Sequence, residues 1–181
     1  MWGLPWSEYN QERFTALAEI LRDGSYDVVV LQEVWFQNHY DIIKDALPYV
    51  SPFRTMNDFF CSIFGAAQLP IECSGLVILS RHPVEEFSYK PYSVRGKLIF
   101  DAQFAVRKGL GVARIRWNGV TIDVSTSHLA TYTLTEVENL WTRKVQARET
   151  IGILEDSLAD LKESELSNRN DFFSSTACCI F

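Results

Sequence analysis

The sequence predicts a layered α/β fold in one globular domain. A buried-strand pattern at 28–31 lies between two segments with helical spacing, and two alternating segments meet at Asn118-Gly119. Helices packed on sheets explain the first pattern, and a hairpin explains the second. We therefore expect mixed sheets rather than an all-parallel sheet. With 181 residues, 47% of them hydrophobic, the chain can bury a sizeable core.

The first predicted elements are a helix and a buried strand. Ser7 or Asn10 is expected to cap the helix, and Gly24 to end it. Its apolar positions recur at helical spacing: Phe14, Leu17, Ala18 and Leu21. The strand begins at Asp27 in "DVVVLQEVW", where a continuous apolar run is typical of a strand covered on both faces.

Shorter elements follow this strand. "YDIIKDALPYV" predicts a short helix, with Ile42, Ile43, Ala46 and Leu47 facing inward. "DFFCSIFGAAQLPIECS" has no clean period and indicates a loop or a partly exposed insertion. "GLVILS" predicts a second compact strand, which the proline of "RHPV" ends. "GVARIRW" and "VTIDVSTSHL" alternate as strands around the Asn-Gly turn.

A long helix is predicted from Thr135 to Leu161. Its apolar stripe is expected to comprise Val137, Leu140, Trp141, Val145, Ile151, Leu154, Leu158 and Leu161. Periodicity is then lost, so we expect a domain over 1–162 and an unstructured tail over 163–181.

Charge and cysteine content restrict the function classes. A net charge of −6 disfavours strong, sequence-independent binding to nucleic acid. The sequence shows neither a membrane-spanning stretch nor the regions of a signal peptide, and as written it is expected to be soluble. Among the four cysteines, Cys61 and Cys73 suit either a disulfide or two free thiols.

Two predicted strands end in polar residues, Glu33 and His128. Either residue alone is more often a solvated or structural side chain than a functional one. Ligands of open α/β sheets bind at strand ends, however, and a carboxylate beside an imidazole is a typical requirement of phosphoester hydrolysis. The pair therefore indicates such a site.

Five blocks of the sequence follow one another over about residues 2–155: "WGLPW", "YDVVVLQEVW", "CSGLVILSRHPV", "DAQFAVRKGLGVARI" and "STSHLATY". In this order they resemble the neutral sphingomyelinases of the endonuclease/exonuclease/phosphatase superfamily. This resemblance implies that Glu33 binds the catalytic Mg²⁺, with Mn²⁺ as an alternative, and that His128 contacts the phosphate. Lys108 and, at a longer spacing than in the family, Asp101 are the nearest counterparts of two further active-site residues.

The resemblance also implies the fold and the reaction. The fold would be part of a four-layered α/β/β/α sandwich with mixed sheets, and the reaction would split sphingomyelin at a membrane surface into ceramide and phosphocholine. Relative to the family pattern, the first strand and the C-terminal half, with its catalytic base, are missing. We therefore expect an incomplete, weakly active chain, whose intact relatives are membrane-associated or secreted.

Three alternatives remain open at this stage. The chain could be another phosphoesterase of the superfamily, such as a nuclease or an inositol-phosphate phosphatase. It could also be a truncated, noncatalytic protein that binds lipid or a partner. Finally, the terminal "CCIF" satisfies a C-a-a-X pattern with Cys178 as the prenylated residue, although it lacks an upstream basic cluster.

Overall fold

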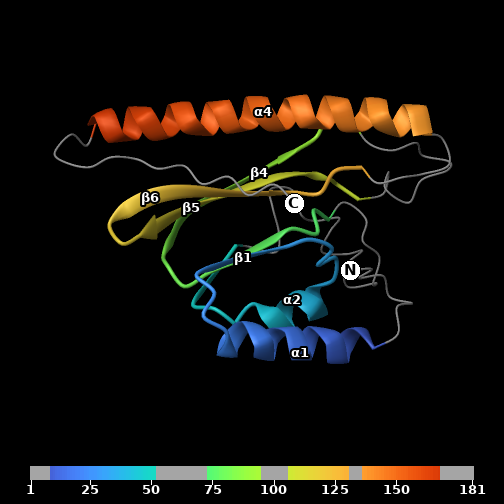
Figure 1. The fold of residues 1–181 in the computed structure, drawn as a ribbon, viewed down its shortest axis with the longest axis vertical. Coiled ribbons are helices and arrows are strands. Elements are labelled where there is room, and N and C mark those ends of the chain that lie inside the picture. Colours follow the sequence, from blue (N-terminus) through green and yellow to red (C-terminus); the bar gives the residue numbers. More distant parts are fainter. Residues whose placement is uncertain (1–8, 52–72, 95–105, 131–135, 168–181) are drawn as a thin grey trace.

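The computed structural model describes residues 9–51, 73–94, 106–130 and 136–167. Two three-stranded sheets lie face to face, with α1 and α2 outside one sheet and α4 outside the other (Figure 1). This arrangement confirms the predicted α/β/β/α layering. In chain order the elements are α1 (Asn10–Asp23), β1 (Val28–Leu31), α2 (Gln37–Ile43), β2 (Tyr49–Val50), β3 (Val77–Ser80), β4 (Val84–Pro91), β5 (Gly109–Trp117), β6 (Val120–Ser127) and α4 (Glu136–Ser167).

The strand order is β1-β3-β2 in the first sheet and β4-β5-β6 in the second. Every strand pair that the structure describes is antiparallel, so the mixed pairing expected from the sequence is not seen in these residues. In the first sheet Val28 pairs with Ser80 and Leu31 with Val77. In the second, Leu110 pairs with Ser127. Both registers bring strand ends that carry polar residues to one region.

The first helical layer is apolar where it meets its sheet. Phe14, Ala18 and Leu21 are buried on α1, as predicted, and Ile43 is fully buried on α2. Asn10 is the first helical residue rather than the cap, and Tyr9 precedes it with a left-handed φ of 61°. Gly24 ends the helix as predicted, with its N–H donating to Ile20 O. Ser7 lies outside the described residues.

Strand β1 is covered on both faces, as its continuous apolar run predicts. Val29 and Leu31 pack against the core beneath the helices. Val28 and Val30 pack against the core between the sheets, which contains Ile78, Ala113, Ile115, Ile122 and Val124. The alternation of side chains along the strand thus joins both cores.

The predicted hairpin joins β5 to β6. Asn118 and Gly119 have φ values of 51° and 84°, the positive values that the turn requires. Strand β4 was not predicted, because the pairing shifts register between Val84 and Glu86 and this irregularity interrupts the two-residue alternation. The two-residue strand β2 was also missed, since so short a strand carries no periodic signal.

The long helix exists, but its buried face differs from the prediction. Leu140, Trp141 and Ile151 of the predicted apolar stripe are 54%, 59% and 57% exposed. Leu161 is buried as expected. Three further buried positions, spaced four residues apart on one face of the helix, carry polar side chains: Thr142, Gln146 and Thr150. The helix also continues to Ser167, beyond both Leu161 and the start of the predicted tail.

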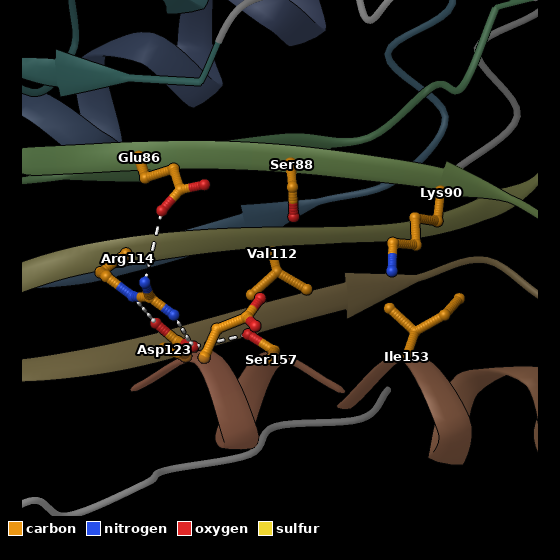
Figure 2. A pocket seen from close by; sticks show the side chains of 9 residues that line it. Glu86, Ser88, Lys90, Val112, Arg114, Asp123, Ile153 and Ser157 are labelled. Carbon is orange, nitrogen blue, oxygen red and sulfur yellow. Dashed lines mark hydrogen bonds and ion pairs between the residues drawn. The ribbon is translucent and has the colours of Figure 1, made fainter. Parts of the chain in front are cut away.

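The polar face of α4 meets a polar sheet face. Arg114 binds Asp123 through two hydrogen bonds, of 3.0 and 3.1 Å, and Ser157 of α4 donates to Asp123 at 2.7 Å. Figure 2 shows these side chains with Glu86 at one end of a small cavity and Lys90 toward the other end. The cavity has a volume of about 110 Å³. Side chains of β5 alternate between this face and the inter-sheet core, which explains why Arg114 points out between Ala113 and Ile115.

Candidate functional site

Glu33 lies where β1 leaves its sheet. Its backbone has a left-handed φ of 64°, a conformation that is uncommon outside glycine. The next residue is held by a hydrogen bond of 3.0 Å from Val34 N to Gly75 O. Gly75 itself has a φ of 67°, and an added Cβ would lie 2.4 Å from the Trp35 ring. A glycine in "CSGL" is therefore required for the turn that carries Glu33.

His128 reaches the same place from the other sheet. Successive residues at the end of β6 alternate in direction, so Thr126 faces the first sheet and accepts a 3.2 Å hydrogen bond from Gln32 Nε2. His128, two residues further, has its Nε2 3.8 Å from Glu33 Oε1. Its ring also lies 5.9 Å from the Trp35 ring, centroid to centroid. The structure thus brings the two predicted strand-end residues together.

Lys108 is the third predicted site residue near this position. It is 7% exposed, and its Nζ donates a 2.8 Å hydrogen bond to the carbonyl oxygen of Leu129, next to His128. Asp101, the fourth, lies outside the described residues. The described part of the predicted site therefore consists of one carboxylate, one imidazole and one ammonium group, contributed by three separate segments.

Three further residues surround this site and were not singled out in the sequence. Trp35 lies against the His128 ring, whereas Gln32 bonds to Thr126 and Gln146 to Ala130, each two residues from His128. Gln32 and Trp35 lie close to Glu33 in "LQEVW". This closeness in sequence to the predicted metal ligand could have identified both residues. Gln146 lies far along the chain on α4 and donates to Val94 O while accepting from Ala130 N. Its place in a polar helix face offered no comparable signal.

The protonation of His128 is set by its surroundings. Burial, and then the positive charge of Lys108, lower the pKa of His128 from 6.5 to about 4. The imidazole is therefore neutral at pH 7, although Glu33 lies beside it. A neutral imidazole still supplies one N–H donor and one acceptor nitrogen, so it can bind an anionic oxygen through a hydrogen bond rather than through a net charge.

The donor set at Glu33 fits a hard divalent cation in part. The Glu33 side chain is 25% exposed and presents carboxylate oxygens, the ligands that Mg²⁺ prefers. The described residues contain no group of three or more His, Cys, Asp or Glu side chains that could enclose a metal ion. Mg²⁺ commonly retains several waters and uses one or two carboxylates with substrate phosphate oxygens, so one carboxylate is compatible with such a site.

Comparison with known families matches residues 1–160 to the endonuclease/exonuclease/phosphatase family. The chain belongs to this family. The match spans both sheets and the segments that carry Glu33, Lys108 and His128, so the family membership and the resemblance found in the sequence agree.

Individual relatives include sphingomyelinases. The chain is 30% identical over 159 residues to a Drosophila melanogaster protein named as a neutral sphingomyelinase, covering 86% of the chain and 34% of that protein. It is 26% identical over 131 residues to human sphingomyelin phosphodiesterase 2, covering 71% of the chain and 29% of the relative. The chain thus spans about a third of the length of these relatives.

A solved structure supports the fold at low sequence identity. A mutant beta toxin from Staphylococcus aureus, determined with bound magnesium ions, matches with a TM-score of 0.65 and 14% identity. The match covers 99% of this chain and 61% of the toxin chain. This likeness confirms the sandwich fold.

Two remaining sequence predictions concern membranes and cysteines. Among the described residues no helix has the length and hydrophobicity needed to cross a bilayer. Cys73 is 2% exposed and disulfide-bonded, whereas Cys61 and Cys178 lie outside the described residues. The pairing of Cys61 with Cys73 and the prenylation of Cys178 remain predictions.

Proposed function

We propose that the chain provides the metal-binding and phosphate-binding part of a magnesium-dependent phosphodiesterase that acts on sphingomyelin. The observation that carries the proposal is the 3.8 Å approach of His128 Nε2 to Glu33 Oε1 across the two sheets, beside Lys108. A carboxylate for a divalent cation and donors for phosphate oxygens are the groups that phosphodiester hydrolysis requires. The relatives named above support sphingomyelin as the substrate.

In this proposal each of the three side chains has a distinct role. Glu33 holds Mg²⁺ or Mn²⁺, which when bound would polarise a phosphate oxygen. Neutral His128 hydrogen-bonds to a phosphate oxygen as negative charge develops, and Lys108 contributes positive charge next to it. The ammonium group of Lys108 has three N–H donors and directs one to Leu129 O, so the same contact also orients the lysine toward the His128 segment.

The proposed activity of this chain by itself is weak. A general base contributes roughly 10²- to 10⁴-fold to such reactions, and among the described residues His128 is the imidazole at the site, already assigned to phosphate binding. We therefore propose that efficient hydrolysis needs residues from the part of the relatives that this chain does not span.

Hydrolysis assays on three substrates test the proposal. The chain and a chimaera that adds the remaining part of human sphingomyelin phosphodiesterase 2 would be assayed on sphingomyelin vesicles, duplex DNA and a soluble inositol phosphate. Release of phosphocholine that needs magnesium, is stronger in the chimaera and is lost in Glu33→Gln and His128→Ala is the expected result. Comparable turnover by the chain alone would show that the proposed dependence on further residues is wrong.

The other substrates separate the remaining phosphoesterase classes. Cleavage of DNA or of the inositol phosphate, with sphingomyelin untouched, would reject the proposed substrate while leaving the family membership intact. The variant Gln37→Met serves as a control, because the half-buried Gln37 bonds to Asp41 on α2 and does not contribute to the proposed site.

A further inference from the structure

The segment that carries His128 is held by hydrogen bonds on both sides of the imidazole. Before it, Ser127 Oγ lies 2.5 Å from Tyr92 OH. After it, Leu129 O accepts from Lys108 Nζ at 2.8 Å and Ala130 N donates to Gln146 Oε1, also at 2.8 Å. The residues immediately around His128 are therefore anchored individually.

Two of these anchors lead to the same helix. Gln146 is 1% exposed on α4 and also donates from Nε2 to Val94 O at 3.2 Å, so it bridges the segments after β4 and β6. Thr150, one turn along α4, lies 2.6 Å from Tyr92 OH and donates to Gln146 O at 2.9 Å. The four polar groups form one buried network between α4 and the His128 segment.

Burial makes this network directional and costly to disturb. Burial is also the largest cause of the raised pKa of Tyr92, so its hydroxyl stays protonated and available for these contacts. A buried amide or hydroxyl that loses its partner carries a desolvation penalty, so each group strongly favours its present geometry. An apolar helix face would pack equally well at several small rotations, whereas these hydrogen bonds specify one.

We propose that α4 is a positioning element for His128, acting through Gln146 on one side and through Thr150 with Tyr92 on the other. The role rests on the proposed function, in which His128 hydrogen-bonds to a phosphate oxygen. A displaced imidazole would weaken that hydrogen bond. Gln146 and Thr150 do not touch the substrate in this account. They set the distance of the imidazole from Glu33 by holding the Ala130 amide on one side of it and, through Tyr92, the Ser127 hydroxyl on the other.

Variants of the full chain test this role without requiring activity. Gln146→Met removes both side-chain hydrogen bonds at similar size, Gln146→Glu retains an oxygen acceptor for Ala130 N–H, and Thr150→Val removes the hydroxyl that contacts Tyr92. Thr15→Val is the matched control, because Thr15 makes the same bond to the carbonyl four residues earlier on α1. Gln37→Met is the control for the glutamine change.

The readouts are the NMR signals of the His128 ring and the hydrogen exchange of the Ala130 amide. In Gln146→Met we expect a shifted ring signal and roughly tenfold faster exchange, the size that loss of one buried hydrogen bond implies. Gln146→Glu should keep the ring signal near that of the wild type. Thr150→Val should also shift it, and both controls should leave it unchanged.

Three results would overturn the role of α4. The first is a folded Gln146→Met variant in which the His128 ring signal and the exchange of the Ala130 amide are both unchanged. The second is a Gln146→Glu variant whose His128 ring signal shifts as much as that of Gln146→Met. If Gln146→Met does not fold, an unchanged His128 signal in Thr150→Val would be the third. Where hydrolysis is measurable, Gln146→Met should lower kcat with little change in KM. Absence of magnesium-dependent hydrolysis by the chimaera would instead reject the proposed function. The NMR readouts do not depend on hydrolysis, so they still test the role of α4.

Discussion

The two helical layers of this sandwich hold their sheets by different chemistry. α1 and α2 present buried apolar side chains such as Phe14, Leu21 and Ile43 to the first sheet. α4 presents Thr142, Gln146 and Thr150, together with Ser157, which bonds to Asp123. Apolar burial stabilises without strong direction, whereas buried hydrogen bonds also specify orientation. The first layer is therefore suited to stability and the second to geometry.

This difference coincides with the two halves of the candidate site. Glu33 and its neighbour Trp35 belong to the apolar half, and Trp35 lies in the core beneath the helices. His128 belongs to the polar half, where its flanking residues are bonded to α4, Tyr92 and Lys108. The site forms where the halves meet, so a change in either layer should alter the relation between Glu33 and His128.

The largest expected effect is a difference in stability between two isoleucine-to-alanine substitutions, one in each helical layer. Ile43→Ala removes a fully buried side chain of α2, and it should lower the free energy of unfolding by about 2–5 kcal/mol. Ile151→Ala truncates a 57% exposed side chain of α4, and it should change the free energy by less than about 0.5 kcal/mol. Urea unfolding of both variants measures the difference.

Equal destabilisation by the two isoleucine variants would contradict the assignment of the core. It would mean that the outward face of α4 is covered in solution and contributes to stability as much as the inner face of α2 does.

A smaller effect is expected from the ion pairs beneath α4. Arg114 is bonded to Asp123, which is 6% exposed, and to Glu86, which is 65% exposed. Asp123→Asn should cost about 2 kcal/mol, because a largely buried guanidinium loses its principal partner and Ser157 loses a charged acceptor. Glu86→Gln should cost less than about 0.5 kcal/mol, since solvent screens this pair.

Thermal unfolding at low and high salt distinguishes these two carboxylates. The small effect of Glu86→Gln should vanish at high salt, while most of the effect of Asp123→Asn should persist because the pair is screened less. Two equal effects would show that the polar layer is solvated throughout.

A pH dependence is expected from His128. Its pKa is lowered from 6.5 to about 4 in the folded chain, chiefly by burial, so the unfolded chain binds the proton more readily. The resulting stability is fully present above pH 6.5 and is lost as the pH falls toward about 4. In the presence of a chelator, His128→Gln should therefore lose less stability over this interval than the wild type. Identical losses would show that the imidazole is solvated.

The sequence predicted the strand-end residues better than it predicted the helix that holds them. The apolar run before Glu33 and the alternation before His128 are local patterns, and each places its polar residue at a strand end. The buried face of α4 depends instead on the outer face of a distant sheet, which carries Arg114 and Asp123 and therefore selects polar helix positions. The predicted burial of Leu140 and Ile151 was therefore wrong, although the helix itself was predicted.

Strand β4 shows a second limit of sequence patterns. Its register shift near Glu86 interrupts the alternation, and its charged side chains are typical of a surface loop as much as of an edge strand. Only the pairing with β5 determines that it is a strand. The convergence of Lys108 on Leu129 O likewise depends on the sheet register, which no local pattern specifies.

The central claim is that Glu33 holds a divalent cation next to His128, and calorimetric titration of Mg²⁺ and Mn²⁺ into the chain tests it most directly. Glu33→Gln keeps the size of the side chain and removes its charge, so it should weaken binding by at least roughly tenfold, about 1.4 kcal/mol. Glu86→Gln, which removes an exposed carboxylate elsewhere, should bind as the wild type does. Equal affinity of folded Glu33→Gln and wild-type chains for both cations would contradict the account.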